Sequence, residues 1–455
     1  MTDQTPQPEH DRPAFDPDAE HQQKPRLRPI RGFPAMRESQ QYLALADAQQ
    51  ISDRVVFTTP AAQAVLPHMT GEQDLDQIVQ TVGHGLTRPW IEDFVAQLDE
   101  AGLIEGPNFD SMIQDMRLAF DSKDVLPPGP SAAIADYLVL QAAGGEDVSD
   151  EEKAEKGPDA LRAQMDKWIA DALKNVNDPS LDTLPAAIVA PHLDYPRGWL
   201  NYAHIYGRLR VVDRPDRVVI LGTNHFGFAS GVCGCDKGYE TPLGTCPLDA
   251  GFKERVCAAL GEENSRRLFE HRFDHEREHS IELHVPWIQH VFGSGAEDEP
   301  IPVFAALVHD PARNSGESYD GEGLDLLPFV DALRRAIEES PGKTLVVASA
   351  DLSHVGPQFG DSVKIGDLED QEATAFREKV LQSDREMLQL VLDRKPEELV
   401  ASMAWMQNPT RWCSVGNIVA TLKIVEPDSV RLLHYAAGVD AQAMGMVSSC
   451  AMAMF

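Results

Sequence analysis

The chain has 455 residues, of which 42% are apolar, so it is long enough for two or three globular domains. Its formal net charge of -33 argues against nucleic acid and anionic membranes as partners, because phosphate groups repel an acidic surface. We find no apolar run that could span a bilayer and no signal-peptide pattern at the start. Six cysteines are too few for a disulfide scaffold. Together these observations predict a cytoplasmic protein.

The first part of the sequence predicts a tail and a small domain. Residues 1–36 are rich in Pro, Gln, Asp and Glu and poor in aliphatic side chains, which predicts disorder. Residues 37–125 have helical periodicity: Thr70-Gly-Glu-Gln73 has capping-box spacing, and Leu103-Ile104 could begin a short wing. This outline predicts a helical, winged-helix-like or peptide-recognition module. Its excess of acids favours protein or peptide contact over DNA, and a helical cap that only stabilises the core is the alternative.

The remainder divides into a connector and a large domain. Residues 126–184 combine a Pro-rich break, an acidic run from Gly144 to Lys156 and one amphipathic helix around Trp168. From residue 185 to residue 455, apolar runs without alternation are separated by helical patterns. Such runs are typical of strands that are covered on both faces. We therefore predict an α/β domain with a largely parallel central sheet flanked by helices.

Three of the predicted strands run directly into polar residues. The run from Ala186 leads to His192, the run from Val218 to Leu221 leads to His225 after Gly222 ends the strand, and the run from Thr344 leads to Asp351 and His354. Ligands and reactive groups gather outside the carboxyl ends of parallel strands. These residues therefore predict one shared site, although a single histidine at a strand end is more often a packing residue.

The residue types at these positions are those of a transition-metal site. Imidazole suits Zn, Fe and Cu, and the thiolate that Cys413 could add disfavours Mg and Ca. Three ligands, His192, His225 and Cys413, would leave an open coordination position, as a catalytic metal requires. Cys413 stands just before a predicted helix, whose N-terminus would favour the thiolate. Asp351 and His354 would then orient the ligands or act as acid and base.

These residues lie in stretches that resemble the Memo family, the B component of the AmmeMemoRadiSam set, whose fold is similar to that of class III extradiol dioxygenases. The matching stretches, in family order, are Ala190-Pro-His-Leu-Asp-Tyr195, Leu221-Gly-Thr-Asn-His225, Thr241-Pro-Leu-Gly244, Glu278-His-Ser-Ile-Glu282, Ser349-Ala-Asp-Leu-Ser-His354 and Cys413-Ser-Val-Gly-Asn-Ile418. The resemblance covers about residues 185–455.

The resemblance implies a division of roles. His192, His225 and Cys413 fall on the metal-binding positions, with iron as the first choice and copper or zinc as alternatives, and His354 falls on the acid/base position. The residues that it implies around the pocket or behind the ligands are Asn224, Tyr195, Glu278, His279 and Glu282. The chain departs from the family at Leu193-Asp194, usually Ala-Gly, and at Ser414, commonly Gly. Both departures alter the pocket floor more than the ligand set.

Two functional classes remain open on this basis, with a zinc peptidase as a minor alternative. The first is a non-heme iron or copper oxidoreductase, similar to a dioxygenase, that acts on a small molecule or peptide while His354 moves a proton. The second is a non-catalytic metal- or peptide-binding accessory protein beside a radical SAM enzyme, docked through the N-terminal module. The minor alternative is a zinc peptidase, because His275-Glu276-x-x-His279 matches a metallopeptidase motif. That motif must lie on one continuous helix, and the surrounding sequence disfavours one.

Overall fold

We describe the protein from a computed structural model that covers residues 13–37, 40–144, 147–293, 299–366 and 370–455. The chain forms two compact units, Met1–Lys123 and Asp124–Phe455, and each is described by itself. Among the covered residues, no helix is both long and apolar enough to cross a membrane.

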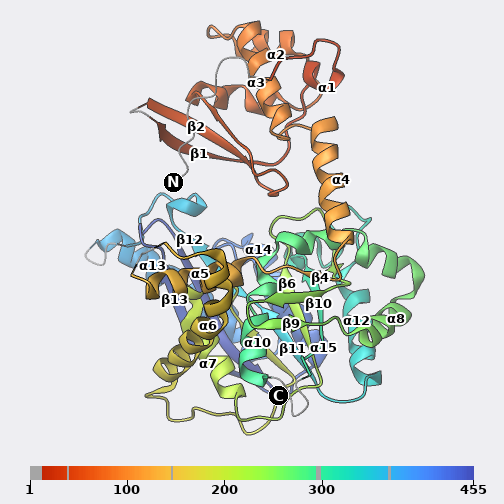
Figure 1. Ribbon diagram of the computed structural model, residues 1–455, viewed down its shortest axis with the longest axis vertical. Coiled ribbons are helices and arrows are strands. Elements are labelled where there is room, and N and C mark those ends of the chain that lie inside the picture. The colour runs from red at the N-terminus through yellow and green to blue at the C-terminus, as the bar shows by residue number, and fades with distance from the viewer. Residues whose placement is uncertain (1–12, 38–39, 145–146, 294–298, 367–369) are drawn as a thin grey trace. The chain divides into compact units, whose positions relative to one another are not determined.

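The first unit is a three-stranded antiparallel sheet with the short helix α1 before it and further helices after it (Figure 1). Leu45 in the central strand and Leu75, Ile78 and Ile91 in the helices are fully buried in its core. Its elements are α1 (Glu20–Gln23), β1 (Ile30–Arg37), β2 (Gln40–Asp47), β3 (Val55–Thr58), η2 (Pro60–Ala64), η3 (Leu66–His68), α2 (Leu75–Val82), α3 (Arg88–Glu100) and α4 (Pro107–Asp121).

The predicted disordered tail is wrong over the part that is described. Both α1 and most of β1 lie within residues 13–36, and the buried Arg28 donates to Asp47 Oδ2 at 3.1 Å and to the carbonyl of Gly102 at 2.5 Å. Partners far along the chain therefore order a segment whose own composition could not order it. Residues 1–12 lie outside the described residues.

The helical module also differs from the prediction in detail. Residues expected to be helical form β2 and β3, because alternate residues such as Leu43 and Leu45 face the core. The capping box of α2 is formed by Asp74 and Gln77 rather than by Thr70 and Gln73. The winged-helix detail is not confirmed, since Ile104 makes only a single bridge, to Leu27.

The second unit is built on an eight-stranded sheet with the order β12-β14-β5-β11-β6-β10-β7, and β13 pairs with β14. The predicted α/β class is confirmed, but the sheet is mixed. Its centre, β5-β11-β6-β10, is parallel, whereas β7, β12, β13 and β14 pair antiparallel. The strands are β5 (Ala187–Ala190), β6 (Arg217–Thr223), β7 (Cys233–Gly234), β10 (Val303–Val308), β11 (Thr344–Ser349), β12 (Asp351–Val355), β13 (Val430–Val439) and β14 (Met446–Met454).

Helices cover the sheet. Every residue of β5, β6 and β10 is buried, which requires cover on both faces. α7 packs on β5, β13 and β14, while α15 packs on β5, β6, β10 and β11 (Figure 1). The helices from α7 onward are α7 (Tyr195–Leu209), α8 (Ala250–Phe269), η4 (Arg272–Arg277), α9 (His279–Glu282), α10 (Val285–Phe292), α11 (Pro311–Asn314), α12 (Leu326–Glu339), η5 (Pro357–Phe359), α13 (Gln371–Leu392), α14 (Pro396–Met406) and α15 (Val415–Val425).

The segment predicted as a connector is folded into the second unit. It contains β4 (Val125–Leu126), α5 (Pro130–Ala142) and α6 (Asp150–Leu173), so it has two helices where one was expected. α6 begins inside the acidic run, because the Ser149 side chain caps it and acids in the first turn suit a helix N-terminus. β4 pairs with β8 (Gly238–Thr241), which pairs in turn with β9 (Gly244–Cys246).

The prediction that Gly222 ends its strand is wrong. Gly222 lies within β6, which continues to Thr223. A Cβ atom at this position would lie 2.5 Å from Ser280 Oγ and 2.6 Å from Ile281 Cδ1. The missing side chain therefore allows α9 to approach the end of β6. This contact places the residues of α9 beside His225.

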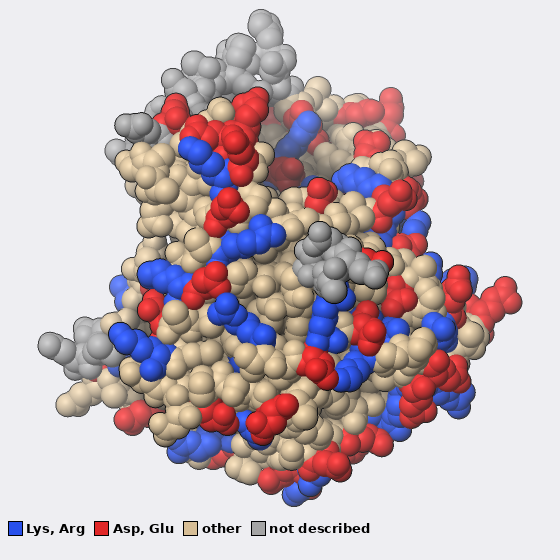
Figure 2. Space-filling view, turned by 60° about the horizontal axis from the view of Figure 1, so that its bottom comes forward, with Lys and Arg blue, Asp and Glu red and all other residues tan. Residues whose placement is uncertain are grey.

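The acidic surface is not organised into one patch on the face shown in Figure 2. There, Asp and Glu are interspersed with Lys and Arg. Mixed charges with a net excess of one sign are typical of a surface that favours solubility.

We predict that a chain starting at Asp124 folds on its own. It keeps β4 and α5, and α5 covers the buried Glu282 carboxylate. A cooperative thermal transition and a native-like circular dichroism spectrum should result. A chain starting at residue 147 should be less stable by about 1–3 kcal/mol or more, because Glu282 loses its donors. A broad, non-cooperative transition of the longer fragment would contradict the prediction.

Candidate functional site

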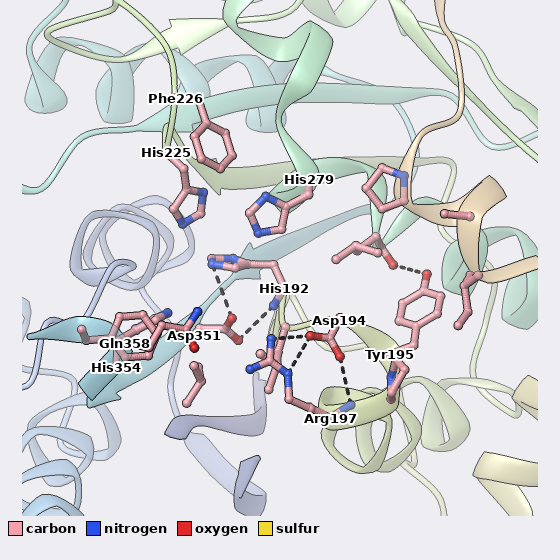
Figure 3. Close-up of a pocket in the computed structure, with 18 residues that line it drawn as sticks. His192, Asp194, Tyr195, Arg197, His225, Phe226, His279, Asp351, His354 and Gln358 are labelled. Carbon is pink, nitrogen blue, oxygen red and sulfur yellow. Dashed lines mark hydrogen bonds and ion pairs between the residues drawn. The ribbon is translucent and has the colours of Figure 1, made fainter. Parts of the chain in front are cut away.

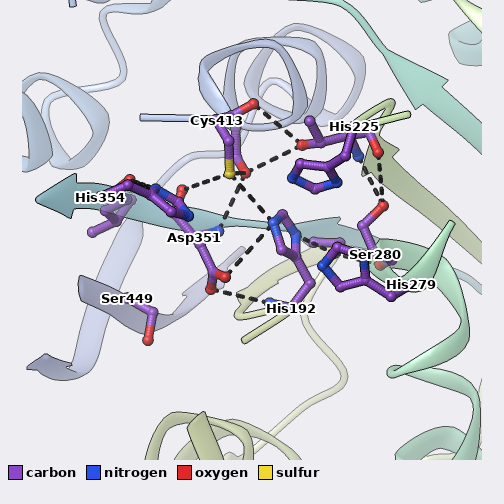
Figure 4. A network of polar contacts seen from close by, with 12 residues as sticks. His192, His225, His279, Ser280, Asp351, His354, Cys413 and Ser449 are labelled. Atoms are coloured by element: carbon purple, nitrogen blue, oxygen red, sulfur yellow. Dashed lines mark hydrogen bonds and ion pairs between the residues drawn. The ribbon is translucent and has the colours of Figure 1, made fainter. Parts of the chain in front are cut away.

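The ends of three adjacent parallel strands bring the candidate residues together. His192 follows β5, Asp351 follows β11 and His225 follows β6, and β11 lies between the other two strands. Cys413 precedes α15. The ligand atoms of His192, His225 and Cys413 all lie within 4.8 Å of one another (Figure 4). The structure thus brings the three predicted metal ligands to one point.

His192 is buried and its ring is held by a serine. Its Nδ1 lies 3.0 Å from Ser349 Oγ, and Ser349 Oγ itself donates to the carbonyl of Ser280 at 2.5 Å. Because that hydroxyl proton is already used, Nδ1 must carry the hydrogen of the His192 bond, which leaves a lone pair on Nε2. Nε2 lies 3.3 Å from Cys413 Sγ. Burial, and then repulsion by His225, hold the pKa of His192 well below its usual value, so the imidazole is neutral.

Glu278 holds two histidines through one oxygen. Its Oε1 lies 3.0 Å from His225 Nδ1 and 3.2 Å from His279 Nδ1, and its Oε2 accepts from the backbone N–H of His225 at 2.8 Å. Burial alone would raise the pKa of Glu278, but attraction to both histidines keeps it well below the ordinary value. The ionised carboxylate therefore accepts Nδ1–H from each ring, and each Nε2 is left to face the site. The atoms of His225, Glu278 and His279 that could bind a metal form a second close group.

His354 is oriented by backbone carbonyls rather than by a carboxylate. Its Nδ1 lies 2.9 Å from the carbonyl of Leu352 and 3.1 Å from that of Arg411. Carbonyl oxygens only accept, so Nδ1 carries the proton and Nε2 a lone pair. Burial lowers the pKa of His354 to about 4. A neutral base is therefore available at the edge of the site.

Asp351 contacts His192 rather than His354. Its Oδ1 accepts from the backbone N–H of His192 at 3.1 Å, and its Oδ2 lies 3.6 Å from His192 Nε2. Burial raises the pKa of Asp351 to about 7. The carboxylate thus positions a ligand and can change its protonation state near neutral pH.

Cys413 does not have the thiolate character that its place before a helix suggested. Its Sγ lies 3.1 Å from Ser414 Oγ and 3.7 Å from the carbonyl of Asp351. Burial, and then the nearby Asp351, raise the pKa of the thiol above its usual value, which outweighs any effect of the α15 N-terminus. A positive charge at the site would be needed to hold Cys413 as a thiolate.

A cavity of about 700 Å³ opens above these residues (Figure 3). His192, His225, His279, Asp351 and His354 all line it, and the Asp194–Arg197 ion pair lies at its side. Its apolar wall is formed by Pro130, Ala133, Ile134, Leu193, Tyr195, Pro196, Phe226, Leu283, Phe359 and Val447. The volume and the apolar lining with few polar groups suit a small organic ligand.

The other predicted pocket residues have different places. Tyr195 lines the cavity and donates its hydroxyl to the carbonyl of Leu283 at 2.6 Å. Asn224 turns away to bind Asp274 Oδ2 at 2.8 Å, which shapes the loop after His225. Glu282 does not line the cavity but holds the start of α5, because its Oε1 accepts from Gly129 N, Ser131 N and Ser131 Oγ at 2.9, 2.9 and 2.5 Å.

Both departures from the family pattern lie at the site. Leu193 and Asp194 line the cavity, and Asp194 caps α7 by accepting from the backbone N–H of Arg197. Ser414 is buried beneath the cavity, where its Oγ accepts from the N–H of Asp351 at 3.2 Å. These residues shape the floor and the support of the site.

The structure excludes the zinc-peptidase alternative and confirms that the motif does not lie on one helix. His275 belongs to η4 and His279 to α9, so no continuous helix carries them both. The two ring nitrogens of His275 are engaged, Nδ1 with Tyr239 OH at 2.8 Å and Nε2 with the carbonyl of Cys233 at 3.1 Å. His275 therefore has no ring nitrogen left for a metal, whereas His279 faces the cavity.

Sequence reasoning missed the polar residues that support the ligands. Ser349 and Ser280 stand within stretches that resemble the Memo family, yet nothing in their spacing indicates that they bond each other. Asn417 donates to Thr223 Oγ1 at 2.9 Å and to the carbonyl of Ser349 at 2.6 Å, and so ties α15 to β6 and β11. The sequence did not indicate that α5 forms part of the cavity wall, because α5 reaches the cavity only through tertiary packing.

Comparison with known proteins agrees with this architecture. A sequence model of the family described as Memo-like protein matches residues 154–453. A MEMO1 family protein of Methanopyrus kandleri is 33% identical over 181 residues, which is 38% of this chain and 55% of that protein. Those of Desulfurococcus amylolyticus and Thermotoga maritima are each 29% identical, over 212 and 259 residues, which cover 46% and 56% of this chain and 68% and 77% of the relatives.

The chain spans about half the length of the Methanopyrus relative. The first unit and α5 precede the matched residues. The match to the family model nevertheless includes nearly all of the eight-stranded sheet, the strand-end histidines and Cys413, and by this match the chain belongs to the family of Memo-like proteins.

Proposed function

We propose that this protein is an oxidoreductase, similar to a dioxygenase, that depends on non-heme iron or copper bound through His192, His225 and Cys413. The observation that carries the proposal is the arrangement of the two histidines. Each has its Nδ1 bonded to Ser349 or Glu278, so that both Nε2 lone pairs are available beside Cys413 Sγ. Two imidazoles and a thiol suit these metals and leave coordination positions for a substrate.

A bound ion would supply Lewis-acid and redox chemistry at the floor of the cavity, and its charge would stabilise the Cys413 thiolate. The residues of the chain do the rest. The apolar wall excludes water and holds the organic part of a small molecule or peptide substrate. His354, neutral at pH 7, accepts a proton from the substrate at Nε2, and Asp351 orients His192.

A second candidate function is that of an accessory protein for a radical SAM enzyme. It is favoured by the first unit, which lies outside the family match and exposes Phe33 and Phe57 by 44% and 49%. Both residues pair with Ala44 across the sheet, so they lie in one row on the same face. Dioxygen uptake by a chain starting at Asp124 would favour the oxidoreductase. Uptake that is absent for every substrate would favour the accessory role.

Replacing a ligand should remove the metal. We expect His225→Ala, purified without dioxygen, to lose most of the bound metal that elemental analysis detects in the unaltered protein, because two donors hold an ion poorly. His275→Ala serves as the matched control and should keep its metal, since both nitrogens of this ring are bonded elsewhere. Full occupancy in His225→Ala would refute the ligand set.

The carboxylate behind the ligands should tune their affinity. In the unaltered protein, His225 bonds both carboxylate oxygens of Glu278, one through its backbone N–H and the other through Nδ1. Glu278→Gln offers only one acceptor oxygen for these two bonds, so His225 loses its fixed orientation. We expect metal binding to weaken by about 10- to 100-fold in a competition titration. Glu282→Gln, which alters the carboxylate at the other end of the same short helix, should bind as the unaltered protein does. Equal affinities for all three proteins would contradict this role of Glu278.

Loss of the base should separate catalysis from metal binding. We expect His354→Ala to keep its metal and to lower substrate-dependent dioxygen uptake by about a hundredfold or more, because a placed proton acceptor has that effect. The substrate is to be found by an uptake screen of small molecules and peptides with the anaerobically purified protein. If His354→Ala loses metal and uptake together, His354 is a ligand and the assignment fails.

A further inference from the structure

A buried carboxylate lies beneath two of the site residues. Asp384 in α13 has no exposed surface and does not line the cavity, yet it accepts four hydrogen bonds. Trp412 Nε1 and Ser353 Oγ donate to its Oδ1 at 2.7 and 2.5 Å, and Tyr435 OH and Ser448 Oγ donate to its Oδ2 at 2.5 and 2.5 Å. A buried carboxylate is costly unless its bonds are all made, so this group strongly determines where its donors lie.

Two of the four donors are chain neighbours of site residues. Trp412 immediately precedes Cys413, and Ser353 immediately precedes His354 in β12. Successive side chains of a strand point to opposite faces, so Ser353 can reach Asp384 while His354 reaches the cavity. A single carboxylate is therefore bonded to the residue before the predicted metal ligand and to the residue before the predicted base.

The backbone around these residues has little freedom. The N–H of His354 donates to the carbonyl of Thr410 at 2.7 Å, and Arg411 Nη1 donates to the carbonyl of His354 at 2.9 Å. Asn408 holds the N–H and the carbonyl of Trp412, each at 2.8 Å. A shift of the Trp412 indole would therefore be passed to Cys413 and, through these bonds, to His354.

We propose that Asp384 is a positioning residue that fixes Cys413 relative to His354 by accepting from Trp412 and Ser353. The proposal rests on the metal site proposed above. Its essential feature is an acceptor rather than a negative charge. The indole N–H can only donate, whereas the hydroxyls of Tyr435 and Ser448 can turn and accept instead.

This distinction predicts opposite results for two substitutions. In Asp384→Asn, the amide oxygen can face Trp412 and Ser353 while the amide nitrogen faces the hydroxyls of Tyr435 and Ser448, so the site geometry should survive. Asp384→Leu fills a similar space but offers no acceptor, so Trp412 Nε1 loses its 2.7 Å bond and keeps only the longer one, to Ser353 Oγ at 3.2 Å. Tyr435→Phe removes a donor on the far side of the carboxylate and is the matched control.

The test is anaerobic titration of the full chain with Co(II), recording its affinity and the thiolate-to-cobalt absorption band. We expect Asp384→Leu to bind about 10- to 100-fold more weakly than the unaltered protein and to have a changed band, as losing a group behind a ligand does. Asp384→Asn and Tyr435→Phe should keep an affinity and a band close to those of the unaltered protein. Melting temperatures are measured in parallel to separate stability from position.

Three results would overturn the proposal. They are unaltered Co(II) affinity in Asp384→Leu, even with a lower melting temperature; an equal loss in Asp384→Asn; and an equal loss in Tyr435→Phe. If Asp384→Leu does not fold, Trp412→Phe takes its place and must weaken Co(II) binding, and unaltered binding there would also overturn the proposal. Failure of the unaltered protein to bind Co(II) would instead refute the metal site itself.

Discussion

The site depends on the parallel pairing of β5, β11 and β6 in the centre of the sheet. Ser349 at the end of β11 pairs with Ala190 of β5, and Ala348 pairs with Leu221 of β6, so the three strands end at nearly the same level. The residues that follow them must then converge on one point, because the loops leave the same edge. His192, Asp351 and His225 are brought together by this register, before any of their side chains interact.

Convergence alone does not make a binding site, because unrestrained imidazoles would turn to bond one another or water. Here Ser349, Glu278 and the carbonyls of Leu352 and Arg411 take up the Nδ1 hydrogens of the histidines. Burial lowers the pKa of His192 and His354 and keeps both rings neutral. The result is a set of Nε2 lone pairs and one thiol whose orientations are set before any ligand arrives, which reduces the cost of binding.

Two parts of the described chain lie outside the family match. α5 adds Pro130, Ala133 and Ile134 to the cavity wall and is fastened by Glu282, a residue of the matched region. The first unit has a core of its own and a sheet with exposed Phe33 and Phe57. The matched region therefore supplies the strand-end histidines, while part of the cavity wall and the separate three-stranded sheet come from residues outside it.

The sequence by itself determined the α/β class, the central strands and the candidate ligands, because unbroken apolar runs that end in His192, His225 and Asp351 report burial and strand ends directly. Local composition misled where distant partners decide the structure, as in the ordered segment around Arg28 and the acidic start of α6. The metallopeptidase motif matched by spacing alone, and its two histidines stand on different helices, as the surrounding sequence indicated. Only the tertiary structure decided which polar groups bond the ligands, since Ser349, Glu278 and Asp384 reach their partners through contacts between segments far apart in the chain, and no local pattern encodes those contacts.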